Sequence, residues 1–192
     1  MKIRITPGAV LLLLTLAPHR DLLFLATLTA AAVHECGHLL AANVLKIPIR
    51  MLEIDLMGAK IHPAAALPSY RAELLLAGAG PLFSLLLALP ALLIGHAFGA
   101  ALLSATLSFA LFNLLPIRGF DGGRILGSAL AALLGTEKAD RILFLSTYLS
   151  LLLLFSLSAC LLLRFGEDAS LAVLSASLFA QLFLSLNTGN KK

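Results

Sequence analysis

Residues 22–45 read LLFLATLTAAAVHECGHLLAANVL, and the interpretation of the whole chain depends on this stretch. It is long enough for a transmembrane helix, which needs about 20 mainly apolar residues. It also holds three ionisable side chains close together: His34, Glu35 and His38. Such side chains are costly inside a bilayer and are usually functional there. The first prediction is therefore a spanning helix that carries a concentrated polar site.

The composition of the whole chain agrees with a membrane environment. Of the 192 residues, 60% are hydrophobic and 12% are charged, whereas a soluble domain carries about 25% charged residues. The net charge of +4 comes from basic residues scattered singly between apolar runs. This pattern is typical of charge flanking membrane spans and does not indicate nucleic-acid binding. With no polar linker or change in composition, we expect one domain over residues 1–192, without an appended regulatory or PDZ-like domain.

Further apolar runs predict an all-α polytopic membrane protein with about six transmembrane helices. A short first span is expected over residues 5–17, starting near Ile5; a signal peptide or a re-entrant segment is the alternative. The later spans are expected at 74–95, 97–117, 142–163 and 169–187.

The distribution of positive charge predicts how these spans are oriented. With six spans and a cytoplasmic N-terminus, all fourteen lysines and arginines except Arg20 and Arg164 fall on the cytoplasmic side. Lysine and arginine are enriched in cytoplasmic loops. Both chain termini are therefore expected in the cytoplasm.

Residues 47–62, IPIRMLEIDLMGAKIH, differ from the apolar runs because apolar and polar side chains partly alternate. Leu52, Ile54 and Leu56 would share one face of a strand, and Gly58 would suit a turn or bulge. We expect a short β-strand or hairpin at the membrane surface after the second span. An amphipathic connector is the alternative.

The stretch HECGH, residues 34–38, has the spacing of a zinc-binding motif. His34 and His38 are four residues apart, so on a helix their side chains lie on one face and can converge on one metal ion. Glu35 is next to the first ligand and can act on a water at the metal without binding the metal itself. The motif predicts a zinc metalloprotease.

Two other functional classes compete with this interpretation. A zinc transporter would need polar groups along a path through the membrane, and the four later spans contain no Asp, Glu, Lys, Arg or His. A catalytically inactive membrane scaffold would have no need of Glu35. Neither pattern is favoured by the residues.

A catalytic zinc ion usually has three protein ligands, so the third must lie outside HECGH. Asp121 is a candidate within NLLPIRGFDGGR, residues 113–124, where Asn113 is a polar residue inside an apolar run. Pro116 ends or kinks the helix, and the glycines around Asp121 would let the chain turn the carboxylate back into the bundle. On these residues alone, a metal ligand and an ordinary helix-ending turn are equally compatible. The other candidates are the remaining carboxylates and His19, His62 and His96.

HECGH followed by N-x-x-P-x-x-x-x-D-G in a later span resembles the site-2 protease family of intramembrane metalloproteases. The chain is most similar to the stage IV sporulation protein FB group. Residues 77–81, AGAGP, resemble the small-residue and Gly-Pro stretch of that family. One departure is Gly119-Phe120, where relatives often carry Pro-Leu before the Asp-Gly pair. This departure concerns the rigidity of the loop rather than the metal ligands.

The resemblance implies a role for individual residues. His34, His38 and Asp121 would bind one zinc ion per chain. Glu35 would be the general base and the later proton donor. Asn113 would bind the substrate backbone near the scissile bond.

The resemblance also implies a cellular setting. We expect a multi-pass protein of a bacterial cell membrane that cleaves membrane-embedded or membrane-tethered proteins near the cytoplasmic face. Its partners would be the lipid bilayer, such a substrate and an inhibitory membrane protein, with no nucleic acid. Activation of a membrane-tethered precursor of a transcription factor would fit the sporulation group.

The predicted orientation can be tested with reporter fusions. Fusions after residues 60 and 140 should report the cytoplasm, and fusions after residues 97 and 167 the outside, because of the bias in positive charge. A reporter at residue 60 that is active only outside the cell would invert the topology.

Overall fold

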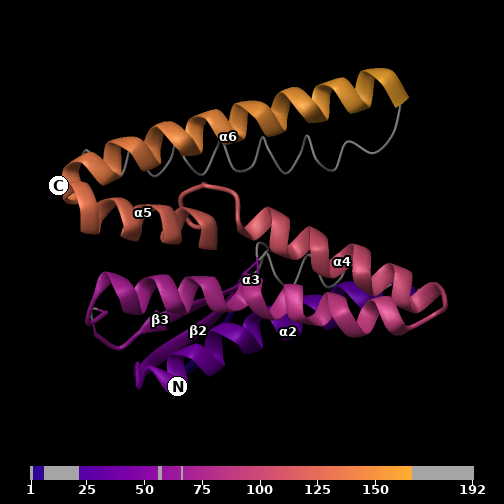
Figure 1. Cartoon of the computed structure of the whole chain (residues 1–192), viewed down its shortest axis with the longest axis horizontal. Helices are drawn as coiled ribbons and strands as arrows, with labels where there is room; N and C mark the ends of the chain where they lie inside the picture. Colours follow the sequence, from indigo (N-terminus) through magenta and orange to yellow (C-terminus); the bar gives the residue numbers. More distant parts are fainter. Residues whose placement is uncertain (1, 7–21, 56–57, 66, 166–192) are drawn as a thin grey trace.

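The computed structural model of the chain describes residues 2–6, 22–55, 58–65 and 67–165 (Figure 1). In these parts five helices accompany a small three-stranded sheet. In chain order the elements are β1 (Lys2–Ile5), α2 (Leu22–Val44), β2 (Ile49–Asp55), β3 (Gly58–Pro63), α3 (Tyr70–Leu93), α4 (Ala97–Asn113), α5 (Asp121–Leu134) and α6 (Thr136–Phe165).

Three of the described helices are long and apolar enough to cross a membrane. They are Leu22–Val44, Tyr70–Leu93 and the Thr136–Cys160 part of α6, and they confirm the helices predicted at 22–45, 74–95 and 142–163. The structure is thus mostly helical and suited to a membrane, as predicted.

The helix predicted at 97–117 is shorter than expected. Helix α4 is apolar but ends at Asn113, because Pro116 cannot continue a helix that needs its N–H group. Residues 7–17 of the span predicted at 5–17, and the whole span predicted at 169–187, lie outside the described residues. The arrangement with six spans therefore stays a prediction.

The strands expected within 47–62 are confirmed as a hairpin. Strands β2 and β3 are antiparallel, with Leu52 opposite Ile61. A third strand was not predicted: β1 pairs with β2 in parallel, and Ile5 lies opposite Ile54. The expectation that a span starts near Ile5 is wrong for that residue, since its backbone belongs to the sheet.

Helix α5 was also not predicted, because the sequence around Asp121 was interpreted only as a glycine-rich turn. The chain turns at Gly119, whose φ of 98° is in the left-handed region that favours glycine. The helix then begins at Asp121 itself. Gly122 and Gly123 serve a different purpose than expected, because a Cβ atom there would collide with the carbonyl groups of the preceding loop.

Helices α2, α3 and α4 pack against one another mainly through small side chains. Ala26, Ala30, Ala91, Leu102 and Ala105 form one buried cluster shared by the three helices. Small residues at such interfaces let helix backbones approach closely, which is how helices associate in lipid. Helix α5 packs between α3 and α6 (Figure 1).

Helices α2 and α3 are in close contact at Gly37. A Cβ atom on Gly37 would lie 2.6 Å from the carbonyl oxygen of Ala79 on α3. No real Cβ atom tolerates this approach to a backbone oxygen, so any side chain at Gly37 would push the two helices apart. Gly78, one residue before Ala79, has no atom within 4 Å of its Cβ position.

This difference predicts opposite outcomes for two Gly→Ala substitutions. Gly37→Ala should destabilise the protein relative to Gly78→Ala by about 1–3 kcal/mol, the usual cost of overpacking. Both substitutions gain the higher helix propensity of alanine, so Gly78→Ala is the matched control. Unfolding of the purified proteins in one detergent measures the difference; equal stability would contradict the close α2–α3 contact.

Candidate metal centre

Three buried residues that are distant in the sequence meet at one point of the helix bundle. His34 and His38 extend from α2, and Asp121 is the first residue of α5. Their relative exposures are 2%, 5% and 6%. In the described part of the chain this is the one group of His, Cys, Asp and Glu with the proximity needed to hold a metal ion.

The three ligand atoms are almost equally spaced. His34 Nε2 lies 3.2 Å from Asp121 Oδ2, His38 Nε2 lies 3.1 Å from the same oxygen, and the two nitrogens are 3.2 Å apart. A tetrahedral zinc ion with bonds of 2.0–2.1 Å places its ligand atoms about 3.3 Å apart. The spacing therefore fits three corners of a zinc tetrahedron.

The outer nitrogen of each ring is held by helix α3. His38 Nδ1 donates a hydrogen bond to the carbonyl oxygen of Leu76 over 2.8 Å, and His34 Nδ1 lies 3.0 Å from Ser84 Oγ. A carbonyl oxygen can only accept, so the proton of neutral His38 is on Nδ1. Its Nε2 lone pair then faces Asp121, as in metal-binding histidines whose other nitrogen is fixed by a neighbour.

The charge of the group favours a bound cation. Burial raises the pKa of the Asp121 carboxyl, but a ring proton on the adjacent Nε2 of His34 or His38, which occupies the place of a metal ion, outweighs burial and lowers this pKa to about 2. Asp121 is therefore an anion at neutral pH. An anionic oxygen and two nitrogen lone pairs repel one another at this distance unless a proton or a metal ion lies between them. The donor set and its spacing together fit zinc.

Gly80 leaves the space that the two rings occupy. A Cβ atom at this position would collide with Nε2 of both His34 and His38. This contact explains one glycine of the AGAGP stretch in α3, because Gly80 faces the two histidine rings. Pro81 follows it within the helix.

Glu35 and Asn113, the two other predicted site residues, do not belong to this group. Glu35 is half-buried between the two ligands in α2, and its Oε2 atom is shielded from solvent. Asn113 is the last residue of α4, and its Nδ2 donates a hydrogen bond to the carbonyl oxygen of Phe109. The Phe109 ring lies 6.0 Å from the His34 ring. Asn113 is therefore one helical turn from a residue that packs beside a ligand.

Two of the other candidate ligands, His62 and His96, lie outside the candidate metal centre. His62 lies in β3, where its Nε2 is 2.9 Å from Glu53 Oε2. His96 precedes α4 and is exposed. His19 falls outside the described residues.

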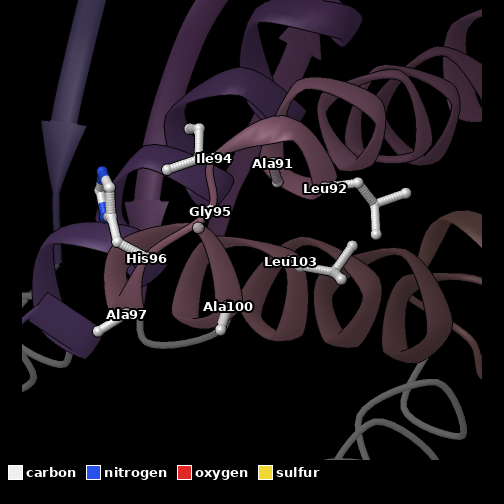
Figure 2. A pocket seen from close by; sticks show the side chains of 9 residues that line it. Ala91, Leu92, Ile94, Gly95, His96, Ala97, Ala100 and Leu103 are labelled. Carbon is white, nitrogen blue, oxygen red and sulfur yellow. The ribbon is translucent and has the colours of Figure 1, made fainter.

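A shallow apolar hollow is present at the α3–α4 turn, and Ile94, Gly95, His96 and Leu103 are among the residues that line it (Figure 2). It lies about 20 Å along α3 from Gly80 at 1.5 Å per residue. Its lining contains no carboxylate or second histidine. The hollow is therefore separate from the candidate metal centre.

Ser84, His34 and Asp121 are linked in series, in an order that resembles a serine protease triad. Ser84 has no exposed surface, however, so a peptide bond cannot reach its hydroxyl. Ser84 instead orients the His34 ring.

Three side chains near the ligands were not identified from the sequence. Ser84 is one polar residue in an apolar run, and Glu73 and Arg124 looked like surface charges. In the structure, Arg124 contacts both Asp121 and Glu73. Glu73 and Arg124 are 51 residues apart, which is beyond any local spacing rule. The contact between Arg124 and Asp121 could have been predicted, because residues three apart on a helix are neighbours.

The third ligand can be tested by metal analysis. Asp121→Ala should remove most bound zinc from the purified protein, because two histidines alone leave the ion weakly held, and Asp121→Glu should retain part of it. His62→Ala is the control, since His62 pairs with Glu53. Full zinc content in Asp121→Ala, measured by elemental analysis, would show that the third ligand lies elsewhere.

Known proteins resemble this chain in structure rather than in sequence. A scan against known protein families finds no match, and no curated protein matches. Among solved structures, the site-2 protease from Methanocaldococcus jannaschii matches 95% of this chain and 89% of its own, with a TM-score of 0.65 and 22% sequence identity. At this identity the likeness establishes that the chain shares the fold of that site-2 protease.

Proposed function

We propose that this protein is an intramembrane zinc metalloprotease that hydrolyses peptide bonds of membrane-embedded or membrane-tethered proteins near the cytoplasmic face. The proposal is carried by one observation: two imidazoles and a carboxylate converge with zinc-like spacing, and both imidazoles lie on a helix long enough to span a membrane. The fold shared with a site-2 protease supports it.

The number of ligands favours a catalytic metal over a structural one. Structural zinc sites are usually closed by four protein ligands, whereas catalytic sites have three and keep one position open. His34, His38 and Asp121 make three, and among the described residues no other His, Cys, Asp or Glu joins the group.

Glu35 is suited to move protons in the reaction. A bound zinc ion would polarise the scissile carbonyl and make water a better nucleophile at neutral pH. The Glu35 carboxylate takes a proton from the attacking water and passes it to the leaving nitrogen, as a general base that then becomes a general acid. Its position in the sequence supports this role, because Glu35 lies between His34 and His38 on α2.

Two further elements are proposed to hold the substrate. Asn113 would bind the substrate backbone through its side-chain amide, since it lies one turn along α4 from Phe109, whose ring is beside the His34 ring. The sheet order β1-β2-β3 makes β3 an edge strand, and β3 contacts α2. An extended substrate segment can pair with such an edge, and it would need to be extended because a helix shields its own peptide bonds.

The setting proposed for this activity is a bacterial cell membrane with both chain termini in the cytoplasm. The resemblance to the sporulation group favours a membrane-tethered transcription-factor precursor as substrate and an inhibitory membrane protein as regulator. The charge distribution supports access from the cytoplasmic side.

The general base can be tested separately from the metal. Glu35→Gln should keep the fold and the bound zinc but lower proteolysis by roughly 10²–10⁴-fold, since the amide cannot accept the proton. Membrane fractions from cells with the native or the variant protein can be compared by N-terminal proteomics for fragments that depend on Glu35.

Cys36→Ser is the matched control, because Cys36 is the next residue along α2 and is exposed. It should leave the same fragments in place. Undiminished cleavage by Glu35→Gln with bound zinc would exclude Glu35 as the base.

A further inference from the structure

The carboxylate of Asp121 has two oxygens with different neighbours. Oδ2 faces the two imidazoles, at 3.2 Å from His34 Nε2 and 3.1 Å from His38 Nε2. Oδ1 accepts a hydrogen bond from Arg124 Nη1 over 3.3 Å. One oxygen is thus directed to the metal centre and the other is held by a cation.

Arg124 is itself fixed from a second helix. Its Nε donates to Glu73 Oε1 over 2.6 Å. Glu73 is in the first turn of α3 and Arg124 in the first turn of α5, so this ion pair joins the ends of the two helices next to the metal centre. Both side chains are largely shielded, at 19% exposure for Glu73 and 31% for Arg124.

The same helix α3 also holds the two histidine ligands, through the Leu76 carbonyl and the Ser84 hydroxyl. The Glu73–Arg124 pair therefore connects the third ligand, on α5, to the element that orients the other two. An arginine can do this because its planar fork donates from Nε and Nη1 at once, whereas a lysine has a single nitrogen.

We propose that Arg124, held by Glu73, is a positioning residue that keeps Asp121 a one-oxygen ligand and so leaves the fourth metal position open. A carboxylate whose second oxygen is free can bind a metal ion through both oxygens. That binding mode would fill the position that the attacking water needs. This inference rests on the metal centre proposed above.

The experiment compares metal binding by the full-length protein in detergent with that of single variants. Arg124→Gln should lower zinc affinity, measured by competition with a chromogenic chelator, by about 10–100-fold, the usual effect of losing a group that orients a ligand. Glu73→Gln should lower it less, because glutamine can still accept from Arg124. Arg124→Lys should fall between Arg124→Gln and the native protein.

The two residues should act as one unit. Since Glu73 acts through Arg124, the double variant Glu73→Gln/Arg124→Gln should bind zinc no more weakly than Arg124→Gln alone. Strict additivity of the two losses would contradict this coupling.

Replacement of zinc by Co²⁺ tests the coordination itself. The visible absorption of Co²⁺ depends on which atoms bind it and in what geometry. The Arg124→Gln protein should therefore show a visible spectrum that differs from that of the native protein at full occupancy, because the second oxygen of Asp121 takes the position that water holds in the native protein. A merely structural ion pair would leave this spectrum unchanged.

The chain offers a matched control in the pair Arg118–Asp140. Its atoms are 2.9 Å apart, but its side chains are 46% and 71% exposed and it joins the α4–α5 loop to α6. Arg118→Gln and Asp140→Asn should keep native zinc affinity and the native Co²⁺ spectrum.

The possible failures can be told apart. If the Arg124→Gln protein folds, native zinc affinity and a native Co²⁺ spectrum in it would overturn the positioning role alone. If it does not fold, the same results in both Glu73→Gln and Arg124→Lys would overturn that role. If the native protein binds neither metal, the metal centre and the proposed function fall together with this inference.

Discussion

The structure depends on burying three polar ligand atoms in a bundle of apolar helices. Two imidazole nitrogens and a carboxylate oxygen lie 3.1–3.2 Å apart, with almost no exposure. Such a group is unfavourable in an apolar interior unless each polar atom is satisfied. The hydrogen bonds between α3 and the outer ring nitrogens meet part of this requirement, and a cation among the three inner atoms would meet the rest. The neighbouring helices are arranged around it.

Close packing is what makes the convergence geometrically possible. Gly37 lets α2 approach the backbone of α3, and Gly80 leaves room for both rings. Farther along the bundle, Ala26, Ala30 and Ala91 belong to a buried cluster of mainly small side chains. In lipid there is little hydrophobic gain from helix association, so close backbone contact supplies much of the attraction. The same small residues therefore serve stability and ligand placement.

The proposed catalytic role requires one metal position to remain open. The proposed third ligand, Asp121, is therefore the one whose position must be controlled most closely. Both histidines come from one helix, and their relative position follows from its geometry. Asp121 comes from another helix and must be brought to them through a turn at Gly119, the packing of α5 on α3 and the contact with Arg124. A shift of that helix would move the carboxylate but leave the histidines in place.

The sequence by itself determined what depends on local patterns: the apolar helices α2, α3 and α6, the hairpin within 47–62, and the i, i+4 spacing of His34 and His38. These follow from hydrophobic length, alternation and helix geometry, which act over a few residues. The tertiary structure decided which distant residues meet; of the contacts below, the family resemblance had implied only that between His34 and Asp121. His34 and Asp121 are 87 residues apart, Glu73 and Arg124 are 51 apart, and strand β1 pairs with β2 across the first long helix. No short-range pattern encodes such contacts, because they arise only when packed helices fix the distance between segments that are independent along the chain.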